Sequence, residues 1–138
     1  MCAQLLQPIV FAQLAALIFL AVLFLQSGID KCVDFSGNLA WLQGHFSKSP
    51  LRAQVKGMLL VVLIAEVVAG ALALLGAIEL VATGATVFAM YAAQLATADI
   101  LMLFFGQRMA KDYAGAAALV PYFILCLGTV LLLQQGSA

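Results

Sequence analysis

The sequence predicts an all-α integral membrane protein: a single domain, residues 1–138, folded as a bundle of four transmembrane helices. Apolar residues make up 66% of the chain, and only six residues are basic and six acidic. Soluble domains carry about a quarter charged residues, so this composition points to a membrane. Four apolar runs, at about 8–28, 57–78, 82–106 and 113–133, are each close to the roughly 20 residues that cross a bilayer as a helix.

Several classes of partner and site are excluded by the remaining composition. The formal net charge is zero and no basic tract is long enough for a nucleic-acid footprint, so the bilayer is the expected partner. Cys2, Cys32 and Cys126 are far apart and form no C-x-x-C pair, and the single histidine, His45, lies in a polar loop. No metal site is therefore predicted.

The basic residues predict how the chain is oriented. All six fall in the first and third connections, and none falls in the predicted turn at 79–83: Lys31, Lys48, Arg52, Lys56, Arg108 and Lys111. The positive-inside rule places both basic loops in the cytoplasm, with both termini facing outward, in a bacterial-type inner (cytoplasmic) membrane.

The first connection is expected to begin at the membrane border. Gly28 is predicted to end the first helix, with Asp30 and Lys31 in contact with water. The segment at about 34–47 then places Phe35, Leu39, Leu42 and Phe46 at helical spacings, with Trp41 beside them. This pattern predicts a short amphipathic helix in the membrane interface, available for docking, although an irregular loop with buried aromatic residues would account for it too.

Two acidic residues in the apolar runs predict a buried polar cluster. Glu66 lies ten residues from Lys56, and Asp99 nine residues from Arg108, which places each about 14 to 15 Å from its basic border at about 1.5 Å per residue. Tyr122 is expected at a similar depth on the fourth helix. No basic residue is expected there, so at least one of the two carboxyl groups should carry a proton.

The cluster has three interpretations. Glu66, Asp99 and Tyr122 could form a proton or ligand site, since carboxyl groups in a membrane often mark such pathways. They could equally be packing contacts that hydrogen-bond to a neighbouring helix, or Glu66 or Asp99 could face a further subunit. Gln13, several turns inside the first helix, is expected to hydrogen-bond within the bundle.

Three segments resemble the DoxX-like family of small membrane proteins, and together they extend over nearly the whole chain. The stretch "FLQSGIDKCVDFSGNLAWL" is similar to the family's first-helix exit, with Ser27, Gly28, Lys31 and Phe35 in matching places. "EVVAGALALLG", residues 66–76, and "FGQRMAKDYAG", before the fourth helix, resemble its second helix and last loop. Asp99 is not part of the resemblance. The resemblance implies a four-helix fold and association with membrane oxidoreductase or quinone-linked systems.

Two functions follow as hypotheses. The first is a non-catalytic accessory or assembly subunit of a membrane oxidoreductase or respiratory-type complex, which docks other membrane subunits. The second is a proton-coupled carrier or quinone-binding protein that uses Glu66 and Asp99. No nucleophile elbow, phosphate-cradling glycine loop or H-E-x-x-H motif is present, so the chain is not expected to be an enzyme on its own or to need a cofactor, with a quinone or a lipid left open as a ligand.

Overall fold

The computed structural model describes residues 7–136, and within them every regular element is a helix. These elements are α2 (Pro8–Val33), α3 (Phe35–His45), the 3-10 helix η1 (Arg52–Gln54), α4 (Val55–Thr83), α5 (Val87–Met109), α6 (Tyr113–Ala118) and α7 (Val120–Gly136). Four spans are long and apolar enough to cross a membrane: Pro8–Val33, Arg52–Thr83, Val87–Met109 and Tyr113–Gln134. The predicted all-α bundle of four membrane-spanning helices is confirmed.

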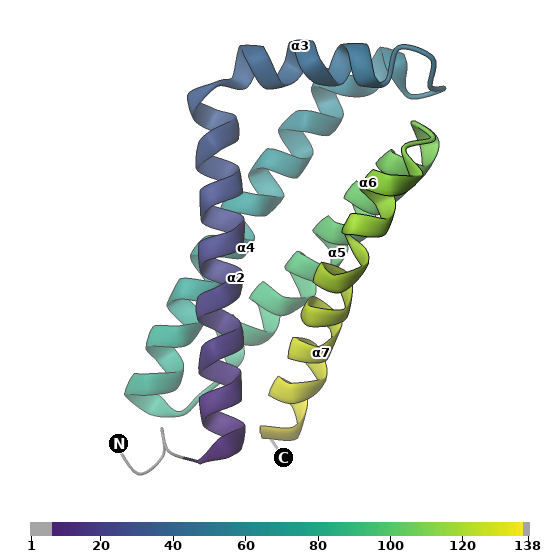
Figure 1. The fold of residues 1–138 in the computed structure, drawn as a ribbon. Helices are drawn as coiled ribbons and strands as arrows, with labels where there is room; N and C mark the ends of the chain where they lie inside the picture. Colours follow the sequence, from purple (N-terminus) through teal and green to yellow (C-terminus); the bar gives the residue numbers. More distant parts are fainter. Residues whose placement is uncertain (1–6, 137–138) are drawn as a thin grey trace.

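The four long helices follow one another around the bundle in chain order. Helix α2 packs on α4, α4 on α5, α5 on α7, and α7 returns to α2. Figure 1 shows α3 lying across one end of this bundle, while the start of α2 and the end of α7 lie at the opposite end. In that view α5, α6 and α7 lean away from α2 toward the α3 end. The long helices therefore diverge toward the end of the bundle where α3 lies.

The core consists of small residues from α4 and α5 packed against larger ones from α2 and α7. One cluster gathers around Phe24, and a second, nearer the chain ends, gathers around Leu17 and Leu133. The exposed fractions of Ala73, Ala89, Ala92 and Ala93 are all 0%, so α4 and α5 meet through alanine faces that let their backbones come close. Gln13 lies in this core and donates a hydrogen bond to the carbonyl oxygen of Leu132 at 3.1 Å, which confirms its predicted contact.

The prediction that Gly28 ends the first helix is wrong. Helix α2 continues to Val33, and Gly28 is buried inside it. A Cβ at Gly28 would lie 2.7 Å from the side chain of Val67, so the glycine serves a close approach between α2 and α4. Isolated glycine weakens a helix by only about 1 kcal/mol relative to alanine, and tertiary packing overrides that preference.

The turn between the second and third spans also differs from its predicted place at 79–83. Helix α4 continues through that stretch to Thr83 and ends at Gly84, whose φ of 78° is in the left-handed region. Glycine adopts this conformation without steric cost, and it is a common helix terminator. Glu79 lies inside the helix, where its Oε1 accepts a hydrogen bond from the backbone N–H of Phe88 at 3.1 Å.

The helix predicted at about 34–47 is confirmed as α3, Phe35–His45. Asp34 begins it, since its Oδ1 accepts a hydrogen bond from the backbone N–H of Gly37 at 3.3 Å. The predicted apolar positions are partly or fully buried, whereas Trp41 is 62% exposed. The irregular-loop alternative is thereby overturned. Whether α3 lies in a membrane interface and docks a partner stays a prediction.

Candidate functional site

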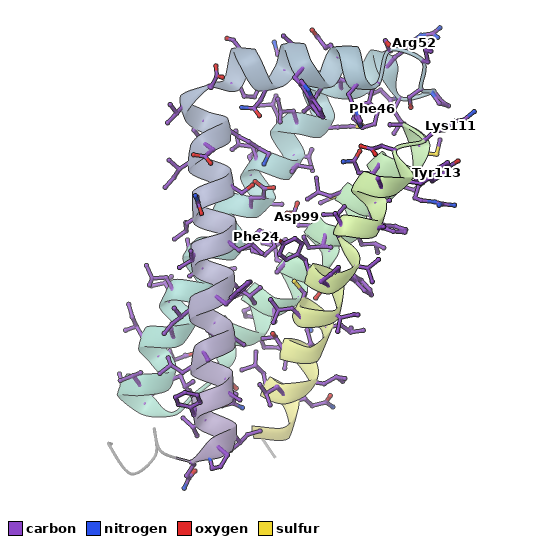
Figure 2. All side chains as sticks on the ribbon, in the orientation of Figure 1. Phe24, Phe46, Arg52, Asp99, Lys111 and Tyr113 are labelled. Carbon is purple, nitrogen blue, oxygen red and sulfur yellow. The ribbon has the colours of Figure 1, made fainter. Side chains whose placement is uncertain are left out.

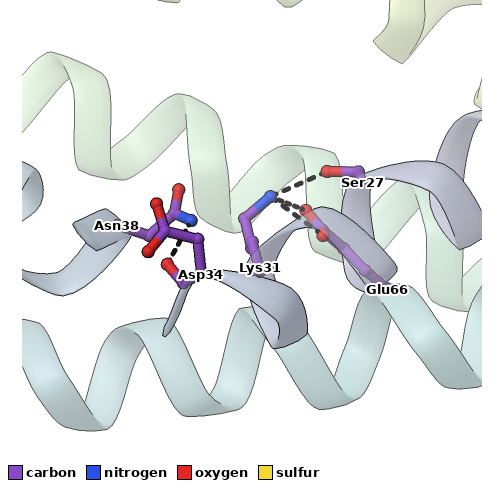
Figure 3. Close-up of polar contacts among 5 residues, drawn as sticks. All are labelled: Ser27, Lys31, Asp34, Asn38 and Glu66. Atoms are coloured by element: carbon purple, nitrogen blue, oxygen red, sulfur yellow. Dashed lines mark hydrogen bonds and ion pairs between the residues drawn. The ribbon is translucent and has the colours of Figure 1, made fainter. Parts of the chain in front are cut away.

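A buried ion pair between Lys31 and Glu66 joins the end of α2 to the middle of α4. The Nζ atom of Lys31 lies 3.0 Å from Oε2 and 3.2 Å from Oε1 of Glu66, and it also donates to the hydroxyl oxygen of Ser27 at 2.7 Å. Figure 3 shows the ammonium group between these two partners. The side chain of Glu66 is 3% exposed and that of Lys31 20%. The expectation that no basic residue reaches the depth of Glu66 is therefore wrong.

The direction of the two helices explains how Lys31 reaches Glu66. Side chains on an α-helix lean toward its N-terminus. Helix α2 ends beside α3 and α4 begins near there, so the Lys31 side chain leans into the bundle and the Glu66 side chain leans back toward it. Because α2 stays helical beyond Gly28, Ser27 and Lys31 are one turn apart on the same helix face. The four-residue spacing between Ser27 and Lys31 is the feature of the sequence that could have predicted their contact.

Asp99, on α5, is fully buried, and within residues 7–136 neither of its carboxyl oxygens has a hydrogen-bond partner. Figure 2 shows it inside the bundle, near Phe24. It interacts electrostatically with both Glu66 and Lys31. The interior of the bundle thus holds three ionisable groups, one each from α2, α4 and α5.

Tyr122 does not join this interior group. Its side chain is 37% exposed, whereas the buried side chain on the neighbouring turn of α7 is Cys126, which interacts electrostatically with Asp99. Tyr122 belongs to the first turn of α7, just after the short helix α6, where the chain leans away from α2 (Figure 1). Depth along the helix was predicted from residue counting, but the lean of α7 places the tyrosine ring outside.

A large apolar pocket lies beneath α3, beside the ion pair. Its volume is about 870 Å³, and its walls come from α3, η1, the first turns of α4 and the last turns of α5. Lys31 is its only charged lining residue among those that the structure describes, and Gln54 and Gln107 are further polar ones. Leu42 and Phe46 of the predicted docking face also line it. No sequence pattern predicts this pocket, because the pocket results from how the helices diverge.

Contacts from α3 reach α5 and α6 beside the pocket. His45 Nε2 lies 2.8 Å from Oε1 of Gln107 and 3.6 Å from Oδ2 of Asp112, which ties α3 to the end of α5 and the start of α6. The neighbouring Phe46 is 6% exposed and points toward the same end, since a Cβ on Gly106 would lie 3.5 Å from its Cζ (Figure 2). His45, which the sequence places in a polar loop, is therefore a bridging residue.

The fold and the site define a helical integral membrane protein with a buried ion pair beside an apolar pocket. Within residues 7–136, no three His, Cys, Asp or Glu side chains gather as a metal site would require. Comparison with known proteins adds no relative: no family model, no curated protein and no solved structure matches the chain. Membership of the DoxX-like family stays a prediction.

Proposed function

We propose that this protein binds an apolar small molecule within the membrane, in the pocket beneath α3, with Lys31 contacting the polar end of that molecule. The pocket itself is the observation that carries the proposal. Its volume of about 870 Å³ lies within the roughly 300 to 1,000 Å³ typical of small-molecule sites. Such sites are mostly apolar and hold a few placed polar groups, as this one does.

The position of the pocket favours entry from the bilayer. Several of its lining residues, Val61, Leu101, Met102 and Phe105, are between 39% and 57% exposed on the lipid-facing surface of α4 and α5. Beside the pocket, His45 links α3 to Gln107, a lining residue of α5. A ligand dissolved in the membrane would thus reach Lys31 without crossing water, which is the arrangement expected for a quinone-sized or lipid-sized molecule.

The proposal concerns binding and leaves the chain without a catalytic step of its own. An accessory role in a membrane oxidoreductase complex, as the family resemblance implies, stays a prediction that is compatible with it. A ligand bound beside α3 would lie next to the surface that the sequence predicts for docking.

The test is to purify the protein in a mild detergent and identify co-purifying lipophilic molecules by mass spectrometry. Gly57 lines the pocket, and a Cβ added to it would meet no atom within 4 Å, so the substitution Gly57→Phe directs a ring into open space there. Gly128, on α7, has equally open surroundings but lies away from the pocket, which makes Gly128→Phe the matched control.

We expect a bound lipophile in the natural protein and in Gly128→Phe, and its loss in Gly57→Phe. Equal amounts of ligand in the two variants would show that the pocket is not the binding site. The same preparation would reveal co-purifying subunits, and their absence would count against the accessory role without touching the pocket.

A further inference from the structure

The positive charge at the pocket wall is already neutralised. Lys31 contacts both carboxyl oxygens of Glu66, at 3.0 and 3.2 Å, and the Glu66 side chain is 3% exposed. Asp99, the third ionisable group that faces this pair, adds either no charge or a negative one. The inner end of the pocket therefore has a net charge of zero or below, although the residue in its wall is a lysine.

The balance between the charges of Lys31 and Glu66 determines which ligand headgroups can bind beside Lys31. A phosphate or carboxylate head next to Lys31 would have to separate the ion pair or lie close to Glu66, and in a low-dielectric interior either arrangement is costly. A carbonyl or hydroxyl oxygen carries no net charge and can accept the ammonium N–H that Ser27 otherwise accepts, so the ion pair with Glu66 stays intact. Lys31 lines the pocket and its side chain is 20% exposed, so part of this side chain remains accessible from the pocket.

We infer that the pocket selects an uncharged lipophile with a hydrogen-bond-accepting oxygen over an anionic lipid, and that Glu66 determines this selectivity by neutralising Lys31. The inference rests on the proposed function, since it assumes that the pocket is a binding site. It goes beyond the proposed function in two ways. It names the class of headgroup that binds, and it assigns a role in specificity to Glu66, which does not line the pocket.

A phospholipid is the main competing occupant. Arg52 and Lys56 lie next to the pocket-lining residues Gln54 and Val55, at the end of the bundle where α4 begins. A phosphate could lie among these exposed basic groups while an acyl chain fills the pocket. Binding of that kind would depend on Arg52 and Lys56 and would be insensitive to Lys31, so the two occupants predict different variants.

The experiment compares probes of matched chain length on the purified full chain in mild detergent. Thermal stabilisation is measured as a function of concentration for 2-tridecanone, which is neutral, for dodecanoate, which is anionic, and for phosphatidylglycerol. In the natural protein we expect apparent affinity for the ketone to exceed that for dodecanoate by about tenfold to a hundredfold, the range that a charge-assisted hydrogen bond contributes. A preference for either anionic probe would overturn the inference.

Variants then locate the source of the preference. Lys31→Met removes the donor and leaves the charge of Glu66 unbalanced, so it should bind the ketone about tenfold to a hundredfold more weakly and still exclude dodecanoate, whereas Lys56→Met should bind both probes as the natural protein does. In Glu66→Gln, combined with Asp99→Asn so that no acid remains to balance Lys31, dodecanoate should bind at least about tenfold more tightly than in the natural protein. Should the double variant fail to fold, the probe ranking in the natural protein and the affinity of Lys31→Met for the ketone still decide the question. An unchanged affinity for the ketone in Lys31→Met would overturn the inference.

Failure of the inference and failure of the proposed function are distinguishable. If no probe stabilises the natural protein, or if Gly57→Phe binds every probe as the natural protein does, then the pocket is not a binding site. If the probes bind and Gly57→Phe excludes them, but the anionic probes bind more tightly, the pocket stands and the role of Glu66 is refuted.

Discussion

Replacing Lys31 with methionine tests the buried ion pair most directly. Methionine keeps the length and apolar stem of the side chain but removes the ammonium group. The pair has a shortest distance of 3.0 Å, with side-chain exposures of 20% and 3%, so it belongs with buried ion pairs and not with surface ones. Surface pairs contribute about 0 to 1 kcal/mol. Removing one partner of a buried pair costs about 3 to 5 kcal/mol, because an uncompensated charge remains.

We therefore expect Lys31→Met to lower the free energy of unfolding by about 3 to 5 kcal/mol at neutral pH. The double variant Lys31→Met/Glu66→Met removes both charges and should recover most of this loss, because apolar replacement of a whole buried pair is often neutral. Lys56→Met is the control. Lys56 is exposed and has no ion-pair partner among the residues that the structure describes, so a change within about 0.5 kcal/mol is expected.

The measurement is unfolding by sodium dodecyl sulfate, titrated into mild-detergent micelles and followed by far-ultraviolet circular dichroism. A loss below about 1 kcal/mol for Lys31→Met would assign the pair to the surface class and refute the reasoning from burial. A double variant as unstable as Lys31→Met would show that the loss comes from packing and not from the charge left on Glu66.

Three other outcomes are expected. Asp99→Val should raise the free energy of unfolding by about 1 to 3 kcal/mol in the same titration, because it removes buried oxygens without partners; a decrease would indicate that Asp99 has an unseen partner. Gly76→Ala should cost about 1 to 3 kcal/mol, since its methyl group would lie 2.7 Å from backbone atoms of α5, whereas Gly57→Ala, in open space on the same helix, should cost nothing. In a Cys2→Ser background, exposed Cys32 should react with a membrane-impermeant maleimide only from the cytoplasmic side; Cys2 itself lies outside the described residues.

Much of the architecture could be predicted from the sequence, because it depends on local properties. Apolar runs of spanning length specify helices wherever backbone groups must be paired in hydrocarbon, and this predicted all four spans and the burial of Glu66 and Asp99. The spacing from Phe35 to Phe46 likewise predicted α3. These predictions require only the sequence and the physical properties of the hydrocarbon and water around the chain.

Element ends were less well predicted, since they depend on the competition between local preference and packing. Gly28 has the character of a helix terminator, yet it lies within α2 because Val67 of α4 occupies the space that a side chain would need. Gly84, with its positive φ, ends α4 instead. Nothing local distinguishes these two glycines, because only the neighbouring helix decides which one is buried.

The sequence by itself determined that this protein has four helices long and apolar enough to cross a membrane and that it carries two acids in its interior. Tertiary structure alone decided that Lys31 pairs with Glu66, that Tyr122 stays outside, and that an apolar pocket opens beneath α3. The physical reason is that these features depend on the relative direction and lean of helices distant in sequence. The Lys31 side chain leans inward from α2, which is antiparallel to α4, and so brings its charge to the depth of Glu66. Counting residues along one helix does not predict this depth.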